Sequence, residues 1–262
     1  MCLLVAAWHA HPEYRLVIAA NRDEFHARPT APLGAWNDTA GIVAGRDLQA
    51  NGTWLAVDAR ARFGSVTNFR EFGRRRRSAP SRGGLIPSFL ERPGSAQDYL
   101  RELETDAPGY AGFNLLLADE TTLWYASNRA DQFALPLSPG IYGLSNEFLD
   151  TPWPKLLRVK ARFSDLIRTP VRPRELFESL FTVLADREPA DSAMLPDSDL
   201  SPELARKLSA PFVLDPVYGT RCSTVLAIGH DGAVTLAERS FDAQGQQSGI
   251  TEHALNAVSD GR

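Results

Sequence analysis

The chain contains little cysteine: Cys2 and Cys222 are the only two in 262 residues. Two thiols are too few for the disulfide framework of a small secreted protein. A long apolar run is also missing, because the stretch that begins at Leu3 meets a polar turn after Trp8, too soon for export or for a membrane span. Position 2 is not glycine, which excludes N-myristoylation. We therefore expect a cytoplasmic protein without stable membrane insertion.

Positive charge is not in excess either. The net charge of −4 gives no reason to expect nucleic acid as a partner. The one basic run, Arg74 to Arg77, lacks the interleaved aromatic residues of a nucleic-acid platform, which favours a solvated loop. The alternative is a lid over a pocket mouth that attracts anionic ligands.

The apolar residues that are present predict one large domain over residues 1–262 with several antiparallel strands. Apolar segments separated by short polar turns indicate hairpins. The expected pairs are residues 3–8 with 14–20, 54–57 with 63–67, 113–117 with 123–126, and 224–228 with 234–237.

Helical stripes lie between these strands. Apolar residues at helical spacing predict helices around residues 156–167 and 176–184, and cap signals at Ser95 and Ser201 predict two more. The strand at residues 3–8 is apolar on both faces and must be covered on both. We therefore predict an α+β fold with two stacked sheets and helices outside them, a four-layer αββα sandwich. A single sheet with helices on one side is the alternative.

Cys2 begins the first strand, and the second strand runs directly into a polar quartet, Asn21 to Glu24. With the turn centred near His11 and Pro12, hairpin pairing places Cys2 opposite Asn21. In that register Asn21 and Asp23 share the face of Cys2, whereas a slip of one residue places Arg22 and Glu24 there. Either register brings charge beside a thiol, although a solvated strand end would explain the quartet equally well.

The chemistry that fits this meeting is catalysis by an N-terminal nucleophile. Once Met1 is removed, the α-amine of Cys2 would serve as the base that activates its own thiol. Arg22 would lower the pKa of the thiol, and Asp23 would hold and orient the ammonium group. His9 and His11 have the spacing of a metal pair but lack a third clustered ligand, so we expect no metal site.

Short motifs along the chain resemble those of the NRDE family, also called the transport and Golgi organisation protein 2 family. The first are Met-Cys at the start, 20–25 (ANRDEF), 45–47 (GRD), 52–54 (GTW) and 67–70 (TNFR). The resemblance continues at 81–83 (SRG), 112–115 (GFNL), 143–146 (GLSN), 151–155 (TPWPK) and 218–221 (YGTR), and so covers nearly the whole chain.

The resemblance implies an N-terminal-nucleophile hydrolase-like fold, in agreement with the predicted layers. The family is similar to cysteine hydrolases of the choloylglycine and penicillin V acylase type, which cleave non-peptide amides with an N-terminal cysteine. Members of the family itself have been linked to Golgi organisation, mitochondrial lipid metabolism and haem trafficking. A fold does not determine a function, so what the resemblance implies for catalysis depends on the residues of the site.

The acylase roles map onto this chain position by position. Cys2 matches the nucleophile, with Arg22 and Asp23 as the groups that set its ionisation. Those hydrolases have the aspartate three residues after the arginine, where this chain has Phe25. Asn146 resembles their oxyanion-hole asparagine, Asn68 is a second candidate donor, and Arg221 resembles their late arginine. The structural alternatives are strand-end asparagines that satisfy loose backbone groups and, for Arg221, a loop residue paired with a surface carboxylate.

Two functions follow from these assignments. The first is a cysteine amidohydrolase acting on linear amides or acyl thioesters, with no cofactor required. The second is a noncatalytic carrier that binds haem or an acyl lipid in the same pocket. In either case the partner is a small molecule, and Asn21, Trp54 and Arg70 are the residues expected to bind it.

Overall fold

Two antiparallel sheets form the centre of the molecule. The computed structural model describes residues 2–39, 41–71, 79–169, 172–195 and 200–256. The run Arg74 to Arg77, whose role was left open above, lies outside these residues. Sheet A has six strands in the order β10-β1-β2-β11-β12-β13. Their bounds are β1 Cys2–Trp8, β2 Tyr14–Phe25, β10 Gly140–Leu144, β11 Tyr218–Gly229, β12 Val234–Phe241 and β13 Gln247–Leu255.

Sheet B has seven strands, which follow one another in chain order from β3 to β9. Their bounds are β3 Thr30–Ala35, β4 Ile42–Asp47, β5 Leu55–Asp58, β6 Phe63–Asn68, β7 Phe113–Ala118, β8 Leu123–Ser127 and β9 Ala134–Leu137. Every neighbouring pair in both sheets is antiparallel. The four predicted hairpins are all present.

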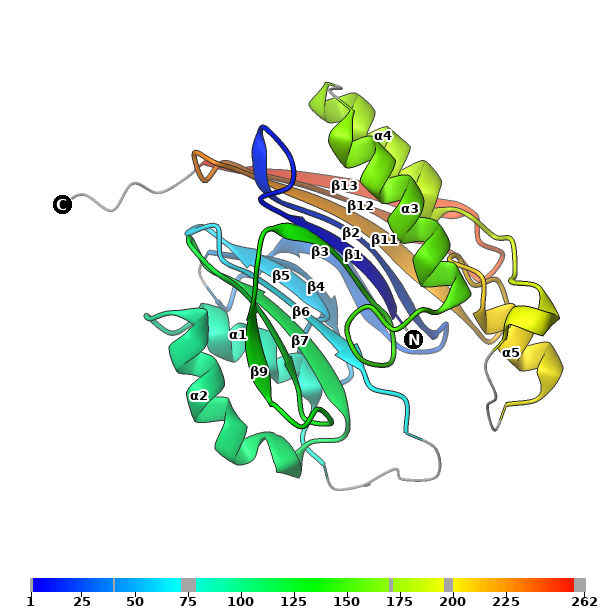
Figure 1. Cartoon of the computed structure of the whole chain (residues 1–262), viewed down its shortest axis with the longest axis horizontal. Coiled ribbons are helices and arrows are strands. Elements are labelled where there is room, and N and C mark those ends of the chain that lie inside the picture. The colour runs from blue at the N-terminus through cyan, green and yellow to red at the C-terminus, as the bar shows by residue number, and fades with distance from the viewer. Residues whose placement is uncertain (1, 40, 72–78, 170–171, 196–199, 257–262) are drawn as a thin grey trace.

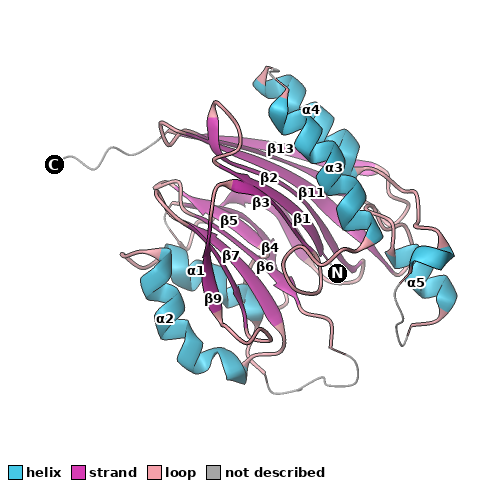
Figure 2. Cartoon of the chain, in the orientation of Figure 1, coloured by secondary structure: helices cyan, strands magenta, loops and turns pink. Residues whose placement is uncertain are grey.

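Helices cover the outer face of each sheet, as Figures 1 and 2 show. The helices are α1 Leu85–Leu90, α2 Ala96–Asp106, α3 Pro154–Arg168, α4 Pro173–Leu184 and α5 Pro202–Leu208, with short 3-10 turns at Arg82–Gly84, Ala107–Gly109 and Ser192–Met194. The predicted caps are formed, since the side chain of Ser95 accepts from the N–H of Asp98 and that of Ser201 from the N–H of Leu204. In the described part of the chain, no helix is both long and apolar enough to cross a membrane.

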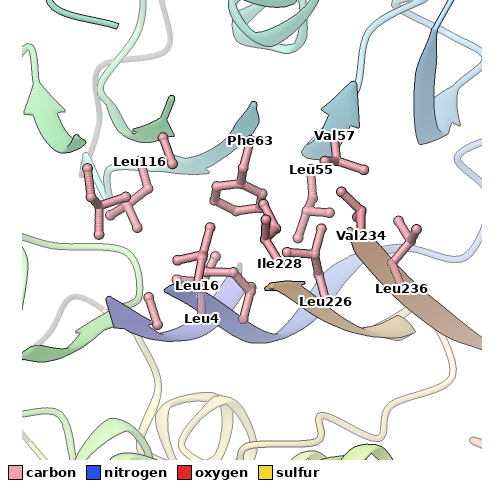
Figure 3. Packing of buried hydrophobic residues seen from close by; sticks show 14 of the residues in the cluster. Leu4, Leu16, Leu55, Val57, Phe63, Leu116, Leu226, Ile228, Val234 and Leu236 are labelled. Carbon is pink, nitrogen blue, oxygen red and sulfur yellow. The ribbon is translucent and has the colours of Figure 1, made fainter. Parts of the chain in front are cut away.

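Three apolar cores separate the four layers. One lies between the sheets, where Leu55 and Phe63 of sheet B face Leu4 and Leu226 of sheet A (Figure 3). A second lies between sheet A and the helices α3 and α4, and a third between sheet B and the helices α1 and α2. This is the predicted αββα sandwich, and the alternative of one sheet with helices on one side is excluded.

The course of β2 corrects one expectation. The polar quartet from Asn21 to Glu24 does not follow the strand but forms its last third, because β2 continues to Phe25. β11 pairs with β2 from Tyr14 to Phe25, with register shifts at Arg221 and at Gly229, and supplies the backbone partners of the last residues of β2. The same pairing corrects the placement of Arg221, which lies within β11 rather than in a loop before it.

Candidate functional site

The register of the first hairpin determines which polar side chain lies beside position 2. Cys2 pairs with Arg22, and Leu3 pairs with Asn21. The pairing is shifted by one residue from the expected register and corresponds to the slip considered above. Since directly paired residues share a face, Arg22 lies on the face of sheet A that Cys2 occupies. Alternate residues of both strands, Leu4 and Ile18 among them, place this face toward the core between the sheets.

Asn146 approaches the same point from the other side of β1. The ladder between β1 and β10 ends at the pair of Leu4 with Leu144, and Asn146 comes two residues after the end of β10. The Asn146 side chain is buried and its Nδ2 donates to the carbonyl oxygen of Asn68 at 2.8 Å. An amide nitrogen carries two hydrogens, so one N–H of Asn146 is left for another acceptor.

Hydrogen bonds join the residues that follow β10, Ser145 to Glu147, to the ends of β6 and β7 in sheet B. The N–H of Arg70 donates to the carbonyl oxygen of Asn146 at 2.7 Å, and Thr67 Oγ1 donates to that of Ser145 at 2.9 Å. From β7, Asn114 Nδ2 donates to the carbonyl oxygen of Glu147 at 2.9 Å. Asn68 and Asn146, 78 residues apart, are thereby brought together.

Asp23 is buried beside this junction. Its Oδ1 accepts a hydrogen bond from Thr220 Oγ1 at 2.7 Å, and its carbonyl oxygen accepts one from Tyr218 Oη at 3.0 Å. Burial raises the pKa of the Asp23 carboxyl, while the positive charge of Lys155 and the Thr220 hydrogen bond oppose the rise. Lys155 is itself buried at the start of α3, where its Nζ donates to the carbonyl oxygen of Leu208 at 3.1 Å.

An open cleft of about 650 Å³ leads to these residues. Its floor and walls come from the end of β2, the start of β5, the end of β6 and residues 79–83. Arg22, Asp23, Trp54, Asn68 and Phe69 all line it. The backbone of Gly52 lies against that of Gly83 so closely that a Cβ on Gly52 would be 2.4 Å from the Gly83 carbonyl carbon. One wall of the cleft is therefore a backbone contact that only glycine permits.

Four candidate residues, Asn21, Arg70, Asn146 and Arg221, are not part of the cleft lining. Asn21 is buried on the helix side of sheet A, where its Nδ2 donates to the carbonyl oxygens of Leu184 and Pro211 and its Oδ1 accepts from Ser223 Oγ. Arg221 Nη1 donates to the carbonyl oxygens of Phe25, His26 and Arg28, and so holds the turn that follows β2. Arg70 lies over the ring of Trp153, 5.1 Å from its centroid, in a small pocket that Asn146 and Lys155 also line.

Sequence reasoning overlooked several of the residues that surround this site. Thr30 bonds to Arg22, Thr220 bonds to Asp23, and Lys155 acts on Asp23 electrostatically. Thr30 follows the Arg28-Pro29 dipeptide, while Thr220 and Lys155 belong to the motifs YGTR and TPWPK, so motif membership was the available signal. Within the described residues, no group of three or more His, Cys, Asp or Glu side chains is placed to hold a metal ion.

Comparison with known proteins places the chain in a family. The family model described as Transport and Golgi organisation 2 matches residues 1–243. The chain belongs to this family. The Transport and Golgi organization 2 homolog of Mus musculus is 34% identical over 261 residues, which cover 92% of this chain and 93% of the mouse protein. The Homo sapiens homolog is 34% identical over 262 residues, with 92% and 93% covered.

The fold of this family member also has a solved counterpart. A crystal structure of the C2A mutant of conjugated bile acid hydrolase from Clostridium perfringens superposes with a TM-score of 0.54 and covers 99% of this chain and 94% of that enzyme. The two sequences are 7% identical, so the likeness concerns the fold alone. The chain thus has the fold of an N-terminal-nucleophile hydrolase.

A second cavity, of about 310 Å³, is lined by Thr30, Arg221, Cys222 and Glu238 among others. Glu238 is buried, and its two oxygens accept from the N–H of Leu33 at 2.8 Å and from Thr224 Oγ1 at 3.0 Å. Burial raises the pKa of the Glu238 carboxyl above its ordinary value of 4.5, against the hydrogen bonds that stabilise its charge. The folded protein therefore holds this proton more tightly than the unfolded chain does.

We expect this proton to make stability depend on pH. Because the pKa is raised in the folded state, the contribution of Glu238 is largest below its ordinary pKa and is lost as the pH rises through the folded-state value. The Glu238→Gln variant lacks this loss. Urea unfolding of both proteins at about pH 5 and about pH 8 measures this loss. From the lower to the higher pH, the free energy of unfolding of the wild type should fall relative to that of the variant. An unchanged difference, or one of opposite sign, would contradict the assignment.

Proposed function

We propose that this protein is an amide or related acyl hydrolase in which Cys2, exposed as the N-terminal residue by removal of Met1, is the nucleophile. The observation that carries the proposal is the pairing of Arg22 with Cys2 at the start of β1, while Asn146 follows the end of β10, the strand on the other side of β1. A cation and a buried acidic side chain of β2, Arg22 and Asp23, thus line the cleft beside the strand that begins with Cys2.

Each neighbour supports one step of an acyl transfer. The guanidinium of Arg22 favours the thiolate form of the Cys2 thiol, which is the attacking species. Asp23 stabilises the α-ammonium group that takes up the thiol proton. The remaining N–H of Asn146 and the amide of Asn68, which lines the cleft, are donors for the oxyanion of the tetrahedral intermediate.

The reaction then runs in two halves. The Cys2 sulfur forms a bond to the acyl carbon, the bond from carbon to nitrogen breaks, and the amine leaves with a proton from the α-ammonium group. Water next attacks the thioester, the bond from carbon to sulfur breaks, and a carboxylic acid is released with the thiol restored. A thioester substrate differs only in that a thiol leaves in the first half. The cleft is lined largely by polar and charged side chains, among which Trp54 and Phe69 are the aromatic residues available to the acyl part.

The likeness to the bile acid hydrolase supports this proposal without settling it. That enzyme was crystallised as its C2A mutant, and so it also has a cysteine at position 2. Arg70 and Trp153, close to Asn146, are further candidates for contact with substrate, while Asn21 would act through the position of β2. Arg221 would likewise act indirectly, because its hydrogen bond to the carbonyl oxygen of Phe25 holds the turn that follows β2.

The proposal is tested by the intact mass of the purified protein before and after treatment with a panel of acyl electrophiles, such as octanoyl p-nitrophenyl ester and octanoyl thioester. We expect a mass that lacks Met1 and a single added acyl group on Cys2. The Cys222→Ser variant is the matched control and should acylate like the wild type. A chain that lacks Met1, stays folded, takes up no acyl group and releases no p-nitrophenol or thiol product from any member of the panel would contradict the proposal.

Binding without turnover is the second candidate. A volume of about 650 Å³ is large enough for an acyl lipid or a flat macrocycle such as haem, and Trp54 and Phe69 are the aromatic residues in the lining. The described residues that line the cleft include no His, Cys or Met, so haem there would be held by its propionates on arginine rather than by an axial ligand from that lining. Titration followed by the Soret band distinguishes the modes, because an axial ligand shifts the band and its removal by substitution abolishes the shift.

A further inference from the structure

Arg22 is a buried cation with an unusual set of partners. Its side chain is only 6% exposed, and Nη1 donates to Thr30 Oγ1 at 3.1 Å. Among the ion pairs formed by the described residues, none includes Arg22. Instead the guanidinium carbon lies 4.1 Å from the centroid of the Trp54 ring. The face of this indole carries the negative end of a quadrupole and therefore stabilises the buried charge without neutralising it.

Gly45 fixes the position of the indole. A Cβ on Gly45 would lie 2.3 Å from Cζ2 and 2.4 Å from Cη2 of Trp54, so the six-membered ring occupies the space that a side chain would take. The backbone of Trp54 is held as well, because its carbonyl oxygen accepts from the N–H of Val66 at 2.9 Å and from Ser65 Oγ at 3.0 Å. The indole therefore has a fixed place between Gly45 and Arg22.

The position of Arg22 matters because of what flanks it in sheet A. Arg22 pairs with Cys2 on one side and with Cys222 on the other, so both cysteines of the chain neighbour it in one row. The charged groups that its field reaches include Asp23, Arg221 and Glu238. A guanidinium free to move could turn toward the acidic group of Glu238 and away from position 2. A side chain stacked on Trp54 cannot do so without losing that contact.

We infer that Trp54 is a positioning residue that holds the Arg22 guanidinium beside position 2, and that Gly45 is required because it leaves the space for the indole. The inference rests on the proposed function, in which Cys2 is the nucleophile. It assigns Trp54 a role that does not depend on contact with substrate. It also predicts different effects for two substitutions of Trp54, because an aromatic residue keeps a ring face for Arg22 and an aliphatic residue removes it.

Alkylation of Cys2 by iodoacetamide tests the inference without any substrate. Its rate across pH, followed by peptide mass, reports the thiolate fraction of Cys2. For Trp54→Leu and Gly45→Ala we expect the rate at pH 7 to fall by about three- to tenfold, with a midpoint shifted to higher pH. Trp54→Phe should retain most of the wild-type rate. Trp36→Leu is the matched control, because Trp36 lies under Arg46, 4.3 Å from centroid to guanidinium, and does not line the cleft.

The outcomes separate this inference from the proposed function. Equal midpoints for the wild type, Trp54→Leu and Gly45→Ala, with all three folded by circular dichroism, would overturn the role of Trp54 even if Cys2 is acylated and turns over. A shift seen equally in Trp36→Leu would overturn it too. If Trp54→Leu fails to fold, Gly45→Ala and Trp54→Phe decide the matter. If the wild type is not acylated, but its alkylation midpoint still lies below that of Trp54→Leu, the hydrolase proposal is contradicted and the positioning role is supported.

Discussion

Replacing Cys2 by serine will reduce turnover of an octanoyl amide or octanoyl thioester by at least about a thousandfold, because the hydroxyl is a far weaker nucleophile than the thiolate that Arg22 favours. A chain with one residue added before Cys2 will lose activity to a similar degree. Its α-amine is no longer on the nucleophile, so the base is missing while the thiol remains. Release of the amine or thiol product measures both effects.

The control for this pair of variants is already in the chain. Cys222, buried on the other side of Arg22, is the only other cysteine, and Cys222→Ser should keep at least a large fraction of the activity. Binding of the octanoyl amide should survive in Cys2→Ser, since the cleft walls are unchanged. Full activity in both Cys2→Ser and the extended chain would end the hydrolase proposal. Binding that persists in a wild type without turnover would favour the carrier.

Replacing Phe63 by alanine will lower the free energy of unfolding by about 3–5 kcal/mol. Phe63 is fully buried in the core between the sheets, where Figure 3 shows it among leucines of both layers. The substitution removes the ring and leaves a cavity that two sheets, each held by its own ladder, cannot close. Chemical denaturation monitored by tryptophan fluorescence measures the loss.

Phe25→Ala is the matched control, because Phe25 is 47% exposed at the end of β2 and its ring meets that of Tyr218 edge-on. The Phe25→Ala substitution should lower the free energy of unfolding by about 1 kcal/mol or less. A loss below about 1 kcal/mol for Phe63→Ala would show that the sheets repack around the cavity. The core between the sheets would then not be as tightly packed as the structure describes.

Local patterns were sufficient to predict most of the elements. The hairpins joined by short turns and the helices with serine caps follow from contacts between residues close in sequence, and they are confirmed by β5 with β6, β7 with β8, α2 and α5. The strand at residues 3–8 demanded cover on both faces, and the structure supplies the second sheet on one side and α3 with α4 on the other. The sandwich was therefore predictable from apolar periodicity.

Pairings between distant segments were not predictable in this way. β1 pairs with β2 only as far as Arg22, and the last residues, Asp23 to Phe25, are in the strand because β11, some 200 residues later, pairs with them. The register of the first hairpin differed by one residue from the value expected from its turn, and that single step exchanged Asn21 for Arg22 on the face of Cys2. Turn chemistry leaves such a step open, whereas the apolar faces of both sheets fix it.

The amino-acid sequence by itself determined that Cys2 begins a buried strand, that a second strand carries Asn21 to Glu24 near it, and that motifs throughout the chain resemble one family. Only the tertiary structure decided which of these residues meet. Asn146, which follows β10, donates a hydrogen bond to the end of β6. The guanidinium of Arg22 lies over the indole of Trp54, which directly precedes β5 of the other sheet. The reason is physical: a strand specifies its own alternation of faces, but the choice of neighbour is made by long-range pairing and by the burial of both sheets against each other.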